Sequence, residues 1–335
     1  MVIVIGLALT VSVGIIVFMT TSASKNNTSF ISQNLTGNWM DIHGLGVYPS
    51  EEGNDDGPLY LATHNGLFKK DKGNNSSTSG WVEVGNDKSD FMGFTINPDK
   101  EGVMYSSGHP QSGGNLGFRI SNDYGATWQD VSDVTAPSPI DFHTMTIGNE
   151  PEIIYGSSGM GDNIYTSSDE GKTWTTTNPP NGERVITLAA NQSNSNIVYA
   201  ATTNGLFSSM DQGKSWQKID NESINGTDAM VTGVEISSDG KIVYAFVAPS
   251  QTDENRTGYI IKSNDGAKTW TKTDGQIDGA VFVSKFAFGN IGEVYVTVTQ
   301  DSIETGVASS VFSSNDDGKT WTLEGTNNNK LLVRT

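Results

Sequence analysis

The chain of 335 residues is acidic, with 38 Asp and Glu against 20 Lys and Arg and a formal net charge of -18. This balance argues against nucleic-acid binding, because the neutralisation of phosphates needs a basic face. The absence of Cys excludes a disulfide framework and Cys-based zinc or thiol chemistry. Abundant Gly, Asn, Ser and Thr, together with many aromatic residues, favour short strands joined by turns.

The first segment, residues 1–24, contains the uncharged apolar run from Met1 to Thr20, which is long enough to cross a bilayer as a helix. Small residues from Thr21 to Ser24 would allow cleavage after Ala23, so a cleaved signal peptide and an uncleaved anchor both remain open. We therefore expect an extracytoplasmic protein that is either secreted or anchored to the cell membrane by this segment. Residues 25–38 are predicted to be a polar linker.

From residue 39 to residue 335, an apolar run, a Tyr-containing run and a short third run recur six times. The apolar runs align without gaps when they are started at His43, Met92, His143, Val185, Val231 and Ser284. The second runs centre on Tyr60, Tyr105, Tyr155, Tyr199, Tyr244 and Tyr295. Because Tyr and β-branched residues fit packed strands, we expect six similar β-rich units.

The motif Ser-x-Asp-x-Gly-x-Thr-Trp follows these runs in five of the six repeats, with small departures. Its copies occupy residues 121–128, 167–174, 209–216, 263–270 and 314–321. The Trp residues recur after 46, 42, 54 and 51 positions, a period that suits one four-stranded blade. The sequence therefore predicts an all-β, six-bladed β-propeller with Asp-box turns over residues 39–335, preceded by an N-terminal apolar helix.

Each motif has a local structural explanation. An Asp side chain can accept backbone N–H bonds across a tight turn, Gly supplies the unusual backbone angles, and Trp packs the turn against the blade. Five copies in symmetry-related turns cannot all face one substrate. We therefore predict a structural role for the motif carboxylates, which are Asp123, Asp169, Asp211, Asp265 and Asp316.

All four histidines are predicted to lie on one face of the propeller, the top, where the inner strands begin. His43 and His143 begin inner strands, whereas His64 and His109 fall in loops between second and third strands, which return to the same face. Carboxylates occupy matching positions at the starts of inner strands, namely Asp41, Asp90, Asp141 and Glu183. Arg184 is also expected near the channel.

Three interpretations of this top-face cluster remain open. His43, His64, His109 and His143 can serve as ligands of a divalent transition metal or a small ligand. A pair drawn from Asp41, Asp90, Asp141 and Glu183 can instead divide the acid and base roles of a glycosidase. In the purely structural interpretation, the carboxylates satisfy backbone N–H groups and the imidazoles pack near the channel.

The Asp boxes resemble those of the BNR-repeat proteins, which include sialidases, sortilin-type receptors and xyloglucan-degrading propellers. The likeness covers about residues 40–325. Within that set, the chain is most similar to exported bacterial propellers labelled glycosyl hydrolases, which have segments similar to Ile-His-Gly-Leu from Ile42, Asp-Phe-Met-Gly-Phe from Asp90, Ser-Gly-His-Pro from Ser107 and Asp-Phe-His-x-Met from Asp141. The resemblance implies the fold and gives modest support to glycoside hydrolysis, because one scaffold hosts many functions.

Sialidase activity is disfavoured, because those relatives clamp a sugar carboxylate with three arginines near the channel. The chain has only Arg119, Arg184, Arg256 and Arg334, and only Arg184 is expected there. We therefore predict a propeller that binds a metal, small ligand or partner at the top face, with a glycoside hydrolase as the alternative. The expected partners are a carbohydrate, a small ligand or a protein, and also the membrane if the N-terminal segment stays uncleaved.

Overall fold

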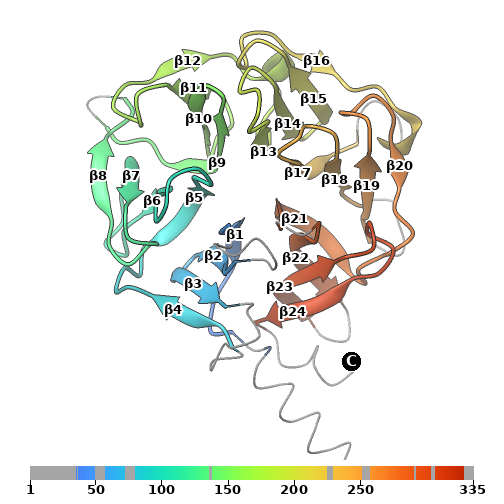
Figure 1. Ribbon diagram of the computed structural model, residues 1–335, viewed down its shortest axis with the longest axis horizontal. Helices are drawn as coiled ribbons and strands as arrows, with labels where there is room; N and C mark the ends of the chain where they lie inside the picture. Colours follow the sequence, from blue (N-terminus) through green and yellow to red (C-terminus); the bar gives the residue numbers. More distant parts are fainter. Residues whose placement is uncertain are drawn as a thin grey trace, which may run out of the picture.

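The computed structural model describes Leu35 and residues 37–49, 57–71, 80–135, 138–224, 229–250, 257–289, 292–302 and 306–327. These residues form six four-stranded antiparallel sheets, arranged as blades around a central axis (Figure 1). The predicted six-bladed β-propeller is confirmed. The predicted N-terminal helix and most of the predicted linker lie outside the described residues. Within the described ranges, no helix has the length and apolar character needed to span a membrane.

Each blade contains four consecutive strands, which run from an inner strand near the axis to an outer strand at the rim (Figure 1). Blade 1 contains β1 (Ile42–Val47), β2 (Leu59–Thr63), β3 (Gly66–Lys70) and β4 (Val82–Val84). Blade 2 contains β5 (Asp90–Ile96), β6 (Met104–His109), β7 (Phe118–Ser121) and β8 (Gln129–Ser132). Blade 3 contains β9 (Phe142–Asn149), β10 (Glu152–Ser158), β11 (Ile164–Ser167) and β12 (Thr175–Thr177).

The second half of the ring repeats this order. Blade 4 contains β13 (Val185–Ala190), β14 (Val198–Thr202), β15 (Gly205–Ser209) and β16 (Gln217–Lys218). Blade 5 contains β17 (Val231–Ile236), β18 (Val243–Val247), β19 (Tyr259–Ser263) and β20 (Thr271–Lys272). Blade 6 contains β21 (Ala280–Phe288), β22 (Val294–Ser302), β23 (Gly306–Ser314) and β24 (Thr322–Thr326). Two short 3-10 turns, η1 (Pro180–Gly182) and η2 (Glu222–Ile224), lie in connections between blades.

The hydrophobic core consists of clusters that each join two neighbouring blades. One cluster packs Leu61 and Phe68 of blade 1 against Tyr295 of blade 6, and another packs Tyr60 of blade 1 against Phe94 of blade 2. The six tyrosines of the second strands are all at most 2% exposed. Apolar burial between blades fixes their relative positions. Every blade repeats the same strand order around one axis, and the inner strands all begin at the same end of that axis, which we call the top face.

The Asp-box turns lie at the opposite, bottom ends of the sheets, between third and fourth strands. In the second box, Asp169 accepts hydrogen bonds from the backbone N–H of Thr173 at 2.9 Å and from its hydroxyl at 2.6 Å. These bonds lower the pKa of Asp169 to about 2. The other four boxes repeat both bonds, at Asp123, Asp211, Asp265 and Asp316.

Ala267 occupies the position that is Gly in the other boxes. Its φ of 66° lies in the left-handed region, which a side chain disfavours. The N–H of Ala267 still donates to the hydroxyl of Ser263 at 2.9 Å, as the Gly N–H does in the other four copies. The hydrogen bonds of the turn therefore hold the left-handed angle in this copy too.

Side-chain and loop contacts close the ring between blades 1 and 6. The indole N–H of Trp39 donates to the carbonyl of Ser309 at 3.1 Å, and the amide of Asn327 donates to the carbonyl of Met40 at 3.0 Å. Lys70 of β3 forms an ion pair of 2.9 Å with Glu324 of β24. All described sheets consist of four consecutive strands, so this junction involves no exchange of strands among the described residues.

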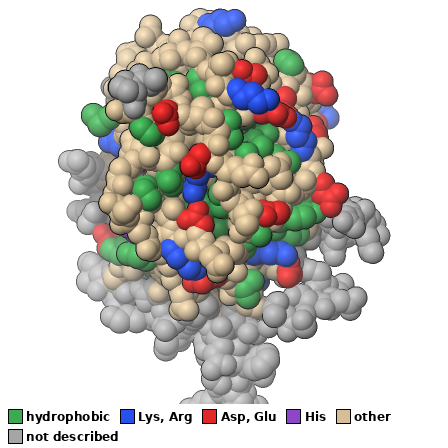
Figure 2. All heavy atoms as spheres, turned by 90° about the vertical axis from the view of Figure 1, so that its left-hand side faces the viewer, with side chains coloured by type: hydrophobic (Ala, Val, Ile, Leu, Met, Phe, Trp, Pro, Cys, Tyr) green, Lys and Arg blue, Asp and Glu red, His purple; other side chains and the backbone are tan. Residues whose placement is uncertain are grey.

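The rim of the propeller shows no concentration of a single charge on the side seen in Figure 2. Acidic and basic side chains are interspersed among neutral ones on this face, which is the left-hand side of Figure 1. A mixed surface of this kind offers no continuous basic track for a polyanion.

Candidate functional site

β-Bulges interrupt the inner strands close to their first residues. In blade 1, Ile42 pairs with Thr63 and Gly44 pairs with Ala62, which leaves His43 unpaired between them. The same irregularity leaves His143 unpaired in blade 3, whereas in blade 2 the two residues Phe91 and Met92 face one residue, Gly108. A bulge changes the direction of its side chains.

The bulge residues line a cavity at the top of the channel, which we call the top cavity. Its volume is about 270 Å³. His43, Met92 and His143 form part of its wall. The other lining residues come mainly from blades 4 to 6 and include Arg184, Ile186, Thr203, Met230, Phe282 and Ser284. Bulged positions on successive inner strands therefore bring imidazole and thioether groups to one cavity.

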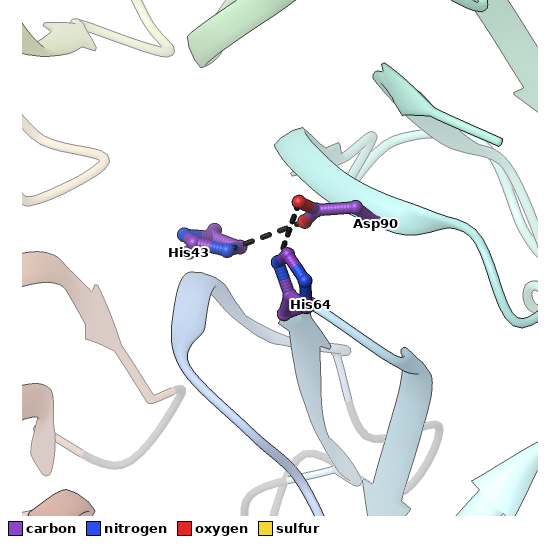
Figure 3. Close-up of side chains that lie close together, drawn as sticks. All are labelled: His43, His64 and Asp90. Atoms are coloured by element: carbon purple, nitrogen blue, oxygen red, sulfur yellow. Dashed lines mark ion pairs between the residues drawn. The ribbon is translucent and has the colours of Figure 1, made fainter. Parts of the chain in front are cut away.

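The first cluster combines His43, His64 and Asp90 (Figure 3). His43 lies in β1 and His64 follows β2, both in blade 1, whereas Asp90 begins β5 of blade 2. Nδ1 of His64 lies 2.7 Å from Oδ2 of Asp90, and Nε2 of His43 lies 3.2 Å from Oδ1. The second pair of atoms is buried but not aligned as a hydrogen bond. Figure 3 shows both rings beside the one carboxylate.

The electrostatics of the first cluster favour a charged carboxylate. Burial alone would raise the pKa of Asp90, but His43, together with His64 and His109, lowers it below its ordinary value. Because His109 belongs to the second cluster, described next, the two clusters are close enough to interact electrostatically. Asp90 is therefore ionised at neutral pH.

The second cluster combines His109, Asp141 and His143. His109 ends β6 of blade 2, whereas Asp141 and His143 lie at the start of the inner strand of blade 3. Oδ2 of Asp141 lies 2.8 Å from Nε2 of His109 and 2.6 Å from Nε2 of His143. Nδ1 of His109 lies 2.8 Å from the carbonyl oxygen of Gly114. The ring of His143 packs against Gly159, where a Cβ atom would come within 2.5 Å of Nε2.

The four predicted histidines thus lie on the top face, but in two clusters of two. In both clusters a carboxylate at the start of an inner strand meets an imidazole from the top end of the second strand of the preceding blade: His109 ends β6, and His64 directly follows β2. The matching carboxylates elsewhere have neutral partners. Oδ1 of Asp41 lies 3.4 Å from the hydroxyl of Ser309, and Oε1 of Glu183 accepts from the amide of Asn204 at 3.0 Å.

The two described arginines, Arg119 and Arg184, lie where the sequence suggested. Arg184 lines the top cavity, and its Nη2 donates to the carbonyl of Gly159 at 2.9 Å. Arg119 instead pairs with Asp87 at 2.6 Å on the strand that leads to an Asp box. Arg256 and Arg334 lie outside the described residues. Among the described residues, no second arginine lines the top cavity.

The methionines that line the top cavity were not among the site residues predicted from the sequence. Met92 occupies the same aligned position as His43 and His143. This equivalence was a signal in the sequence that could have identified Met92 as a site residue. Met230, immediately before β17, had no comparable signal because its direction depends on the fold. Both residues line the cavity together with the imidazoles.

Each cluster has the donor atoms of a metal site. The three ligand atoms, two imidazole nitrogens and one carboxylate oxygen, all lie within 4.8 Å of one another in both clusters. This set suits zinc and other divalent transition metals, and three protein ligands leave a coordination position open. The residues present therefore fit a divalent ion in either cluster.

The protein-family comparison identifies a known family over the middle of the propeller. The model described as "Sortilin, neurotensin receptor 3" matches residues 117–289, just over half of the chain. The chain belongs to the Sortilin-Vps10 family. The match to the Sortilin-Vps10 model runs from the residue before β7 to the residue after β21. The resemblance to Asp-box propellers predicted from the sequence is confirmed.

Xyloglucanases are similar to this Sortilin-Vps10 chain. A xyloglucanase of Hypocrea jecorina is 26% identical over 238 residues, which cover 58% of this chain and 27% of the enzyme. Xyloglucanase Xgh74A of Acetivibrio thermocellus is 26% identical over 203 residues, which cover 51% of this chain and 23% of the enzyme. The chain thus spans about a quarter of the length of these curated relatives.

A solved structure confirms the propeller architecture. The GH74 enzyme of Niastella koreensis superposes with a TM-score of 0.58 and 17% identity, covering 87% of this chain and 46% of that enzyme. At this identity the likeness supports the fold alone.

Proposed function

We propose that the protein is an extracytoplasmic propeller that binds divalent transition-metal ions at its top face, one in each cluster. The observation that carries the proposal is the proximity of three ligand atoms, within 4.8 Å, in both clusters. Neutral imidazole and carboxylate together are typical ligands of zinc and related ions. The open position of each site would be available to water or to a small ligand in the top cavity.

The tautomer of His109 supports a cation at the second cluster. Nδ1 can approach the carbonyl oxygen of Gly114 at 2.8 Å only as a donor, because a carbonyl oxygen accepts. In the neutral ring, Nε2 then has a lone pair that faces the Asp141 carboxylate at 2.8 Å. This lone pair and the carboxylate are together available to a metal ion. A backbone carbonyl that fixes the second nitrogen in this way is typical of metal-binding histidines.

The contrast with blades 1 and 4 argues against a purely structural role for the imidazoles. A hydroxyl contacts Asp41 and an amide donates to Glu183, so neutral side chains suffice to hold a carboxylate at the start of an inner strand. Asp90 and Asp141 each have two imidazoles, more than this structural role requires. The excess of nitrogen ligands points to a bound cation.

The extracytoplasmic location is supported by the sequence. The apolar run from Met1 to Thr20 suits either a cleaved signal or a membrane anchor. The absence of Cys and a formal charge of -18 fit a domain that works outside the cytoplasm without disulfides. If the segment stays uncleaved, it attaches the propeller to the membrane.

The direct test of metal binding is a calorimetric titration of the full chain with Zn²⁺. We expect two bound ions per chain for the wild type and one for each of His64→Gln and His109→Gln, because each substitution removes one ligand from one cluster. Thermal denaturation in the presence of zinc should show a matching rise in melting temperature. The proposal fails if the wild type shows no saturable binding, or if neither variant changes the stoichiometry.

Glycoside hydrolysis is the second candidate, favoured by the similarity to xyloglucanases. It would use Asp90 and Asp141 as its carboxylate pair, in place of metal binding. Two imidazoles contact each of these carboxylates. Among the described residues that line the top cavity, Phe282 is the only Phe, Tyr or Trp. Release of reducing ends from xyloglucan by metal-free protein, abolished in Asp90→Asn and Asp141→Asn, would favour hydrolysis over our proposal.

A further inference from the structure

A thioether lies between two imidazoles on the wall of the top cavity. His43, Met92 and His143 occupy bulges at matching positions of β1, β5 and β9, the inner strands of three successive blades. All three residues line the top cavity. The order around the wall is therefore imidazole, thioether, imidazole.

The two imidazoles each have a nitrogen that the clusters do not use. Nε2 of His43 lies beside Asp90, and Nε2 of His143 lies beside Asp141. In the described part of the chain, neither ring has a hydrogen-bond partner at Nδ1. Histidines that donate one N–H to a carboxylate commonly bind a metal through the other nitrogen. The two Nδ1 atoms and Sδ of Met92 are thus left for a ligand in the top cavity.

We propose that His43, Met92 and His143 bind monovalent copper in the top cavity. The inference rests on the proposed function, because it assigns a second mode of metal binding to the same imidazoles. A thioether is a soft ligand that favours Cu(I), whereas zinc in protein sites takes thiolate, imidazole and carboxylate. Asp90 and Asp141 would not be ligands in this mode: Asp141 would accept the Nε2–H of His143, and Asp90 would lie beside Nε2 of His43.

Competition between the modes follows from their shared residues. A neutral ring whose Nε2 binds a divalent ion in a cluster carries its proton on Nδ1, and this Nδ1 then has no lone pair to bind Cu(I) in the top cavity. Zinc in the first or second cluster should therefore weaken the binding of Cu(I) in the top cavity. Sulfur coordination by Met92 is the property that distinguishes the copper mode.

The test compares Met92→Leu with Met230→Leu in the full chain. Leu approximates the volume of Met without its sulfur, and Met230 lines the same cavity from blade 5. Cu(I) affinity is measured without oxygen by competition with a chromophoric chelator, and Zn²⁺ affinity by calorimetry. We expect Met92→Leu to weaken Cu(I) binding by roughly tenfold or more and to leave Zn²⁺ binding unchanged, whereas Met230→Leu should change neither.

The outcomes separate this inference from the proposed function. If the wild type binds Zn²⁺ but no Cu(I), or if Met92→Leu binds Cu(I) as tightly as the wild type, the copper mode is wrong and the two clusters stand. If the wild type binds neither ion, both proposals are wrong. X-ray absorption at the copper edge gives a second measurement on the wild type, in which we expect a sulfur ligand, and a shell of only nitrogen and oxygen would overturn the inference.

Discussion

Replacing Asp90 with Asn is expected to weaken zinc binding at the first cluster by roughly 100-fold and to leave the second cluster occupied. The substitution keeps the shape of the side chain but removes its negative charge and its strongest ligand oxygen. The imidazoles already hold the pKa of Asp90 below its ordinary value, so the wild-type carboxylate needs no deprotonation to bind a cation at neutral pH. Calorimetric titration at neutral pH should show one tight ion instead of two.

Asp41→Asn is the matched control for this variant. Asp41 holds the same position in the sequence of blade 1, but it contacts the hydroxyl of Ser309 and belongs to neither cluster. We expect the Asp41→Asn variant to bind two zinc ions with wild-type affinity. An equal loss in both variants would mean that the substitutions disturb the top of the inner strands in general, and the ligand role of Asp90 would be refuted.

Replacing Lys285 with Met is expected to lower the free energy of unfolding by about 3 kcal/mol at neutral pH. Nζ of Lys285 lies 2.8 Å from Oε2 of Glu235, and the two side chains are only 9% and 15% exposed. Both line a cavity of about 220 Å³ at the bottom end of the channel. Without the ammonium group, the carboxylate of Glu235 stays largely buried without its partner charge.

The loss of stability in Lys285→Met should depend on pH. Burial raises the pKa of Glu235 above its ordinary value of 4.5 even in the presence of Lys285, and removal of the lysine raises it further. A carboxyl group with a raised folded-state pKa contributes stability below its unfolded-state pKa, and this contribution is lost as the pH rises. The difference from the wild type should therefore be small near pH 4 and large near pH 7.

Urea denaturation of Lys285→Met and of the double variant Lys285→Met/Glu235→Leu tests this account. The double variant should regain most of the stability at neutral pH, because an apolar pair can replace a buried ion pair at little cost. A deficit that is the same near pH 4 and near pH 7 would show that lost packing, not the unpaired carboxylate, causes the effect. A double variant that is no more stable than Lys285→Met would also show that lost packing causes the effect.

The architecture was predictable because its signals repeat along the chain. Five Asp boxes and six tyrosine-containing runs give the number of blades, and the alternating direction of strands gives the face on which His43, His64, His109 and His143 lie. Neither inference needs side-chain geometry. The closure of the ring was not predictable, since it depends on contacts such as that of Trp39 with Ser309, 270 positions apart.

The arrangement of the site depended on details that local sequence does not encode. Strand periodicity assigns side chains to alternate faces, but a bulge breaks this alternation at His43, Met92 and His143. The division into two clusters follows from these local changes of direction. The pair of Glu235 and Lys285 joins different blades, and so no spacing in the sequence predicts it.

The central claim is that each cluster holds its own metal ion, and anomalous diffraction from crystals grown with zinc tests it most directly. The account predicts two peaks at the zinc edge, one among His43, His64 and Asp90 and one among His109, Asp141 and His143. The absence of a peak at either cluster, at zinc concentrations that saturate binding in solution, would contradict it.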